Sequence, residues 1–514
     1  MNQSTFTRTF TRAMSELHTW GGLVFGWLLF VIFFTGTLAV FSAEITHWMQ
    51  PAVRPAQTEP AQAIAAADKK LRQLAPKADL WMIAMPQERS PGLEIIWKKG
   101  LATLEKQLDP QSGTLLKSPE TEGGHFLAHF HFQLHSGKSG LWLVSFASVV
   151  MLAALVSGIA IRTQVFTEFF RLRWRKNWLS AHTLTGVLTL PFVVLITYTG
   201  LTVTLFMVQP AIPQVLYGSS WKSPATVAAN NYERPRANLP GELVPLARLL
   251  PLAEEELGKG KISFIRVSNP GDRQAVVTFF RTVDDTIVAM SSRAAFDGVT
   301  GEMLGSQTTW NKYVKFYRTL VGLHIARFGG YPLAWLYFTA GLVSCAMIAA
   351  GLVFFTVKRR CRYARSSAAA QMMYRAIEAL NTTAVTGIII ACGAYLWANR
   401  LLPSTLSGRA DAEITVFFGI WLLMLLHAFL RPPLRAWTEQ LGIAAGLCMG
   451  LPVLNALTTK VGLLPAIARR DWMTAGVDLT AVVLGLLLAI TAWQVALKQQ
   501  RAEQCRSVSN TVNS

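Results

Sequence analysis

Long apolar runs dominate the pattern of hydrophobic and polar positions along this chain. A bilayer crossing takes about 20 residues, and eight runs are long enough, at about 20–42, 136–160, 183–208, 332–357, 380–398, 413–430, 438–457 and 474–496. The first run is too long for a cleaved signal peptide, and no small-residue cleavage site follows it. The pattern predicts an α-helical polytopic membrane protein with about eight spans.

Two long polar segments separate the early runs, at about 43–130 and 209–322. Each has one helix-like stretch, followed by short β-rich runs bounded by Pro, Gly and Asp, which are strand and turn signals. The β-rich runs are 80–84, 93–97 and 107–116 in the first segment and 262–267, 275–280 and 295–304 in the second. We therefore predict two small α+β domains, each with one helix packed on a small antiparallel sheet.

Composition and charge narrow the function classes. The chain is 52% hydrophobic, too apolar for a soluble protein of 514 residues. Its net charge of +19 gathers in short basic segments beside spans, at 162–176 and 358–375, as the positive-inside rule predicts for cytoplasmic loops. This argues against nucleic-acid binding. The positive-inside rule also places the N-terminus in the cytoplasm and both polar segments outside. Lys460, Arg469 and Arg470 would then lie outside, against the rule, so charge does not fix the orientation of the last four spans.

The first 360 residues repeat themselves. His18 and His182 each precede glycines four and eighteen residues later; these are Gly22 and Gly36, and Gly186 and Gly200. His131 and His324 share a second pattern, with glycines at +6 (Gly137, Gly330), tryptophans at +11 (Trp142, Trp335) and glycines at +27 (Gly158, Gly351). The repeat predicts two copies of a span–domain–span unit, at 15–162 and 180–360. Residues 375–500 form four further spans of unassigned role.

The four histidines indicate a metal cofactor held between helices, with haem as the best candidate. Two axial imidazoles suit a haem iron for electron transfer. Gly22 lies one helical turn from His18, and eighteen residues are five turns, or about 27 Å, so Gly36 returns to the same face. We interpret Gly22, Gly36, Gly186 and Gly200 as room for a flat cofactor; helix packing is the alternative. The five cysteines include no Cys-x-x-Cys pair, so haem would be non-covalent, b-type.

Topology assigns the ligand pairs. His18 and His182 both lie at the inner end, and His131 and His324 at the outer end, so we predict one bis-histidine haem for each pair. His129 and His135 lie beside His131 and either contact substrate iron or belong to a hydrated helix mouth. Two arginines near His324, Arg318 and Arg327, either neutralise haem propionates or attract an anionic chelate. His427 has no duplicate, and we expect it to make an interhelical hydrogen bond.

Two turn motifs carry a resemblance to a known family. The segments 108–113 (LDPQSG) and 296–301 (FDGVTG) resemble the closing hairpin of PepSY domains, and the flanking spans are similar to the PepSY-associated transmembrane helix family. The resemblance covers about residues 10–360. It implies two periplasmic PepSY-like domains and a relationship to inner-membrane ferric-siderophore reductases that hold two b haems. Such a protein passes electrons across the membrane and reduces a periplasmic Fe(III)–siderophore to Fe(II) for iron uptake.

The electron donor stays open between a quinol and a flavin reductase, since no flavodoxin-like or dinucleotide-binding segment indicates a flavin in this chain. A rival hypothesis comes from the association of PepSY domains with peptidase regulation. In that case the outer domains would bind a periplasmic protease or other partner, and the histidines would be structural. A transporter acting through the last four spans is a third hypothesis, disfavoured by their few intramembrane charges.

Overall fold

The computed structural model describes residues 3–53, 58–161, 177–209, 211, 214–215, 232–459 and 461–512. The basic segment 162–176 and Lys460 lie outside these ranges. The chain divides into two compact units. The helical unit comprises Met1–Met49, Pro119–Thr204 and Leu336–Ser514, and the sheet unit comprises Gln50–Ser118 and Leu205–Trp335.

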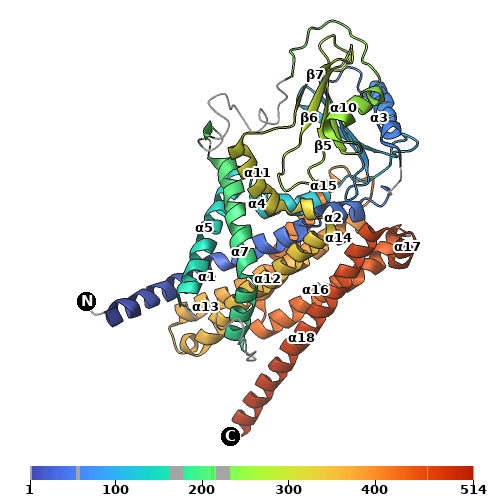
Figure 1. The fold of residues 1–514 in the computed structure, drawn as a ribbon. Helices are drawn as coiled ribbons and strands as arrows, with labels where there is room; N and C mark the ends of the chain where they lie inside the picture. The colour runs from blue at the N-terminus through green and yellow to red at the C-terminus, as the bar shows by residue number, and fades with distance from the viewer. Residues whose placement is uncertain are drawn as a thin grey trace. The chain divides into compact units, whose positions relative to one another are not determined.

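Long helices confirm the prediction of a polytopic membrane protein. Within the described residues, eight helical stretches are long and apolar enough to cross a membrane, one for each predicted span. They are built from α1 (Gln3–Ala39), α5 (Gly137–Ile161), α7 (Trp178–Val208), α12 (Gly330–Ala364), α13 (Ala368–Thr382) continuing into α14 (Ile388–Leu401), α15 (Arg409–Leu430), α16 (Pro433–Thr459) and α18 (Trp472–Val512) (Figure 1). Shorter helices α2 (Ser42–Met49), α4 (Gly123–Gln133) and α17 (Leu463–Ala468) complete the unit.

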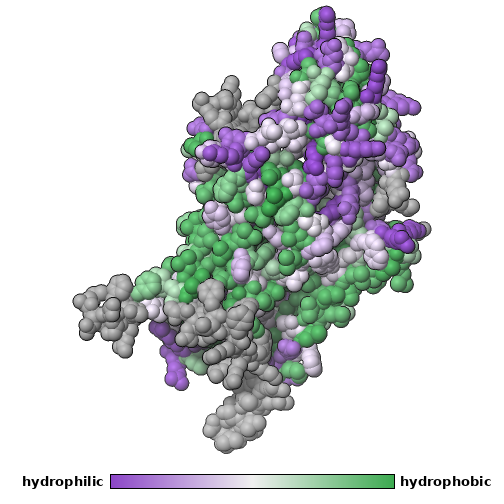
Figure 2. All heavy atoms as spheres, viewed as in Figure 1, coloured by the Kyte–Doolittle hydropathy of each residue, from purple (hydrophilic) through white to green (hydrophobic). Residues whose placement is uncertain are grey.

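Burial separates core helices from lipid-facing helices in this unit. Helix α1 is buried on nearly every side along its second half, including Phe30, Val31 and Phe34, as expected of a helix enclosed by others. Helix α18 instead exposes large apolar side chains such as Leu487 and Trp493. Hydrophobic side chains cover most of the visible helical surface (Figure 2), which is the surface that a bilayer would solvate.

The sheet unit contains one antiparallel sheet of seven strands in the order β3-β2-β1-β4-β5-β6-β7. The strands are β1 (Leu80–Ala84), β2 (Leu93–Lys99), β3 (Ala102–Leu108), β4 (Ile262–Ser268), β5 (Val276–Arg281), β6 (Arg293–Asp297) and β7 (Met303–Gln307). Helices α3 (Pro60–Leu74) and α10 (Leu246–Leu257) pack on it through one shared hydrophobic core. Each polar segment thus supplies one helix and one set of strands, as predicted.

The two sets of strands are joined, which corrects the prediction of two separate sheets. Strand β1 pairs with β4 over five residues, from Leu80 opposite Ser268 to Ala84 opposite Phe264. Ile83 lies opposite Ile265 in this ladder, and both are fully buried. The pairing covers the edge that the three-strand set β1–β3 and the four-strand set β4–β7 would each otherwise expose, and an exposed edge is prone to aggregation.

The two predicted Asp-x-x-Ser/Thr-Gly turns have the same geometry. The Asp109 carboxylate accepts hydrogen bonds from the backbone of Gln111 and Ser112, and Asp297 accepts equivalent bonds from Val299 and Thr300. Both turns end on a glycine with positive φ, +67° at Gly113 and +79° at Gly301, where a side chain would be strained. After the turn the second copy forms strand β7, whereas the first copy keeps only a bridge between Leu108 and Leu115.

Candidate cofactor site

Two histidines from the two copies face each other in the helical unit. His18 lies on α1 and His182 on α7, and their ring centroids are 6.0 Å apart with an interplanar angle of 68°. Both side chains are half-buried. The sequence repeat predicted this pair, and the structure places the two residues together.

Each ring is anchored at Nδ1 by a backbone carbonyl of a neighbouring helix. His18 Nδ1 lies 2.9 Å from the Ala154 oxygen on α5, and His182 Nδ1 lies 2.8 Å from the Met347 oxygen on α12. A carbonyl oxygen only accepts, so Nδ1 carries the proton and Nε2 keeps its lone pair. Histidines that bind metals have this arrangement, because the second-shell hydrogen bond orients the ring and raises its basicity.

A glycine lies against each ring, four residues after the anchoring carbonyl. A β-carbon placed on Gly158 would lie 3.2 Å from His18 Cε1, and one on Gly351 would lie 3.0 Å from His182 Nδ1. A larger residue at either position would displace the imidazole. Sequence reasoning found these glycines as part of the repeat but assigned them no role; their +27 spacing was the signal.

His131 has the same arrangement at another level of the bundle. Its Nδ1 donates to the Ile32 oxygen on α1 at 2.7 Å, and a β-carbon on Gly36, again four residues further, would lie 2.6 Å from the ring. The His131 imidazole thus lies beside Gly36, and the role of this glycine as room for a flat cofactor stays a prediction. Burial lowers the pKa of His131, so the ring is kept neutral, as a metal ligand must be.

His324 belongs to the sheet unit, at the last turn of α11 (Lys312–Ile325). Its pairing with His131 therefore stays a prediction from the repeat. In the second copy the residues equivalent to Ile32 and Gly36 are Ile196 and Gly200.

The donor set around His18 and His182 fits a haem. No group of three His, Cys, Asp or Glu side chains suited to a metal occurs among the described residues. Two imidazoles are too few for a typical zinc site, but haem brings four nitrogens of its own and needs only axial ligands. Gly22 has open space beside it, whereas Gly186 faces the Met347 sulfur.

The other predicted site residues have varied surroundings. His129 and His135 are both exposed, and the His135 ring lies 5.6 Å from that of Phe418 on α15. Arg327 forms an ion pair with Asp284 at 2.8 Å, so its guanidinium is already paired with a carboxylate of the protein. The Nε of Arg318 is buried and has no hydrogen-bond partner within the described part of the chain. Arg318 is therefore the better candidate for a propionate partner.

The last four spans hold buried charges that sequence reasoning missed. Arg409 and Glu413 on α15 are almost fully buried and 2.6 Å apart. On α14, Arg400 lies over the Trp48 ring at 3.9 Å, and the Trp48 indole donates to Asp478 of α18 at 2.8 Å. These charges lie near the ends of their helices. The contacts of Arg400 and Asp478 join different helices, so no spacing in the sequence predicts them. Arg400 and Asp478 both contact Trp48, so they connect α2 to α14 and α18.

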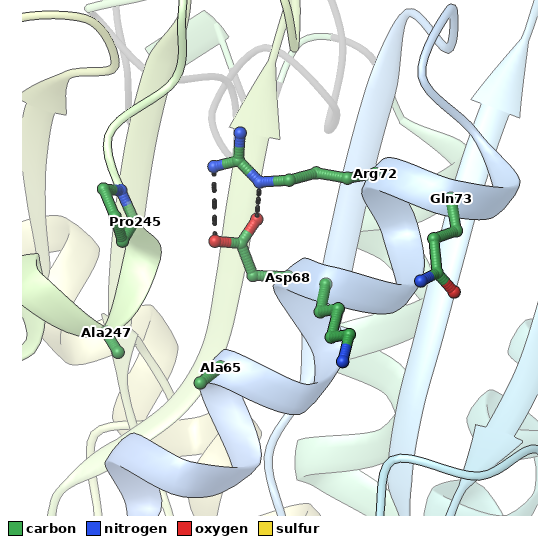
Figure 3. Close-up of a pocket in the computed structure, with 7 residues that line it drawn as sticks. Ala65, Asp68, Arg72, Gln73, Pro245 and Ala247 are labelled. Atoms are coloured by element: carbon green, nitrogen blue, oxygen red, sulfur yellow. Dashed lines mark hydrogen bonds and ion pairs between the residues drawn. The ribbon is translucent and has the colours of Figure 1, made fainter.

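A shallow pocket lies between α3 and α10 (Figure 3). Asp68 and Arg72 form an ion pair at its wall. Asp68 also accepts the backbone N–H of Leu246, and Arg72 donates to the Leu243 oxygen at 3.0 Å. Because these polar groups are already paired, we interpret the pocket as a clamp between the two helices.

Comparison with known proteins gives a family match for the first two thirds of the chain. A search of curated proteins finds no match. The family model described as the PepSY-associated TM region matches residues 15–358, about two thirds of the chain, and ends before α13. Both histidine patterns and all seven strands lie within the matched residues. The chain therefore belongs to the PepSY-associated TM region family.

Proposed function

We propose that this protein is a b-type dihaem electron-transfer protein of the bacterial inner membrane. The observation that carries the proposal is the His18–His182 pair. The two rings come from equivalent positions in the two copies, and both keep Nε2 as the available ligand atom. A bound haem would supply one-electron redox chemistry at this position.

The chain's own residues hold and orient the ligands. The carbonyl groups of Ala154 and Met347 fix the two rings in one tautomer, and Gly158 and Gly351 let the rings lie against their helices. His131 has the same anchoring through Ile32. The sequence repeat supplies His324 as its partner for a second haem.

The acceptor in this proposal is a periplasmic ferric-siderophore. Reduction of Fe(III) to Fe(II) weakens binding by hard oxygen ligands, so the iron can leave its chelator. This step rests on the resemblance to siderophore reductases.

The haem content of the purified protein tests the proposal. In detergent, the dithionite-reduced protein should show a sharpened Soret band and split α and β bands, at two haems per chain. A folded but colourless preparation would refute the proposal and favour the alternative, a membrane-anchored PepSY protein that regulates a periplasmic partner.

Histidine substitutions locate the two haems. His18→Ala and His182→Ala should each remove the same haem, and the double variant should lose no more. His131→Ala and His324→Ala should each remove the other one. His47→Gln is the matched control, because His47 is buried and pairs with Asp471 at 3.3 Å without belonging to either pair. Loss of haem in this control but not in His182→Ala would contradict the assignment.

A further inference from the structure

A hydrogen-bonded histidine–carboxylate pair connects α15 and α16 in the helical unit. His427 Nε2 lies 2.8 Å from Glu439 Oε2. Arg431 binds the same carboxylate in a bidentate manner, through Nε and Nη2 at 2.9 Å each. The three side chains are partly exposed, at 23% for His427, 33% for Glu439 and 50% for Arg431. The predicted interhelical bond of His427 is thus confirmed, but its carboxylate partner remains accessible.

A buried amide sets the tautomer of His427. Gln440 Nε2 donates to the Met424 oxygen at 2.8 Å and lies 3.2 Å from His427 Nδ1. Nδ1 is therefore the acceptor, and Nε2 donates its proton to Glu439. The Gln440 oxygen is held in turn by the Thr386 hydroxyl at 2.7 Å. Thr386 belongs to a π-helical turn, Thr383–Gly387, between α13 and α14, and such turns often occur at functional sites.

An open apolar surface adjoins the carboxylate. Gly442 and Gly446 follow Glu439 by three and seven residues, so they lie on its face of α16. Both glycines are exposed, and nothing lies within 4 Å of a β-carbon placed on either. Exposed residues next to them along α16 are apolar, including Ile443 and Met449. A lipid-soluble molecule can therefore reach Glu439 from the bilayer.

The cluster lies at the same end of the helical unit as the His18–His182 pair. Arg375 of α13 donates to the Arg431 oxygen, and the neighbouring Tyr374 hydroxyl donates to the Thr356 oxygen of α12 at 3.0 Å. Thr356 is about one turn and a half beyond Gly351, on which the His182 ring lies. Further along α13, Asn381 donates to the Leu352 oxygen at 3.0 Å.

We propose that His427, Arg431 and Glu439 form the binding site of a membrane quinol, the electron donor of this protein; the inference rests on the proposed dihaem function. The Glu439 carboxylate accepts a quinol hydroxyl, and Arg431 supplies a donor for the quinone carbonyl. Oxidation breaks two O–H bonds. The proposed haems would each accept one of the two electrons, and the two protons leave in turn through Glu439 to water. His427 and Glu439 lie within candidate spans, where an ionisable residue is a functional candidate by default.

Quinol-driven haem reduction tests the carboxylate. Decylubiquinol is mixed with the haem-loaded protein in detergent, and the Soret shift is followed by stopped flow. Glu439→Gln should slow reduction about 100-fold, since a proton acceptor contributes roughly 10²–10⁴, while dithionite still reduces the haems. His47→Gln, at the other histidine–carboxylate pair, should react like the unchanged protein. Equal rates for Glu439→Gln and the unchanged protein would overturn the proposal.

Quinone binding gives a second readout that does not use the haems. Decylubiquinone should raise the melting temperature of the unchanged protein and of His47→Gln, but not that of Gly446→Leu, in which the leucine fills the surface beside Glu439. Gly446→Leu meets no neighbouring atom and should fold even if Glu439→Gln does not. No quinone-dependent shift in the unchanged protein would overturn the quinol site. Absence of haem in a protein that still binds quinone would refute the proposed function instead.

Discussion

The two copies of the repeated unit meet in two different ways. In the helical unit they meet through side chains, with His18 and His182 facing each other across 6.0 Å. In the sheet unit they meet through backbone, along the β1–β4 ladder. The ladder pairs its polar groups with each other, and the Asp68–Arg72 clamp does the same for α3 and α10. At the histidine pair only Nδ1 is paired within the described residues.

This difference separates a scaffold from a site. Buried polar groups are normally satisfied, and the β1–β4 ladder satisfies its own groups internally. In the His18–His182 pair, Nδ1 of each ring donates to a backbone carbonyl, whereas Nε2 keeps its lone pair. The same duplication therefore produced a closed structural joint in one unit and a candidate ligand-binding joint in the other.

The largest expected effect comes from filling the space behind a histidine ring. Gly351→Leu should remove the haem that His18 and His182 share, because the new side chain occupies the place of the His182 ring. Gly158→Leu should do the same through His18. The haem-to-protein ratio measures both, and should fall from two to one. Gly476→Leu is the control, since nothing lies near that glycine; full occupancy in Gly351→Leu would contradict the role of the ring contact.

Loss of packing at the β1–β4 ladder should affect stability and leave the haem bound by His18 and His182 in place. Ile265→Ala removes a fully buried side chain and should destabilise the sheet unit by about 2–5 kcal/mol. Pulse proteolysis in urea would measure the change. Leu104→Ala on the edge strand β3, where the side chain is 47% exposed, should cost much less. Equal losses would mean that the ladder is not the structural joint.

The helix clamp should give a smaller loss. Asp68→Asn removes the charge that binds Arg72 and weakens the acceptor of the Leu246 N–H, at a cost of about 1–3 kcal/mol. The same proteolysis measurement reports it, with Lys69→Gln on the exposed rim of the pocket as control. If both variants are as stable as the unchanged protein, the pocket has another role.

The smallest expected effect is a pH dependence of stability that arises at the turn beginning with Asp109. Hydrogen bonds from the Ser112 backbone and hydroxyl lower the pKa of Asp109 below its ordinary value. The folded state therefore prefers the ionised form, and this stabilisation is present above the unfolded pKa of about 4. It is lost as the pH falls through the folded value. Asp109→Asn should flatten that part of the stability profile, measured by thermal denaturation; an unchanged profile would refute the contribution.

Prediction succeeded where local pattern sufficed. Span lengths, the helix that each polar segment packs on the sheet and the Asp-x-x-Ser/Thr-Gly turns follow from hydrophobic runs and turn chemistry, which act over neighbouring residues. Strand β3 was only partly predicted, because this edge strand is mostly polar and exposed and lacks apolar alternation. The pairing of His18 with His182 was predicted because the duplication supplied long-range information that a single copy lacks.

The sequence by itself determined the spans, and its repeat singled out the histidines that we propose as ligands. Only the tertiary structure decided which group lies beside each glycine, that β1 and β4 close one sheet, and that Glu439 and His427 meet beside an open apolar surface. These are contacts between residues far apart in the chain. They depend on the rotation and register of whole helices and strands, which periodicity within one element does not specify.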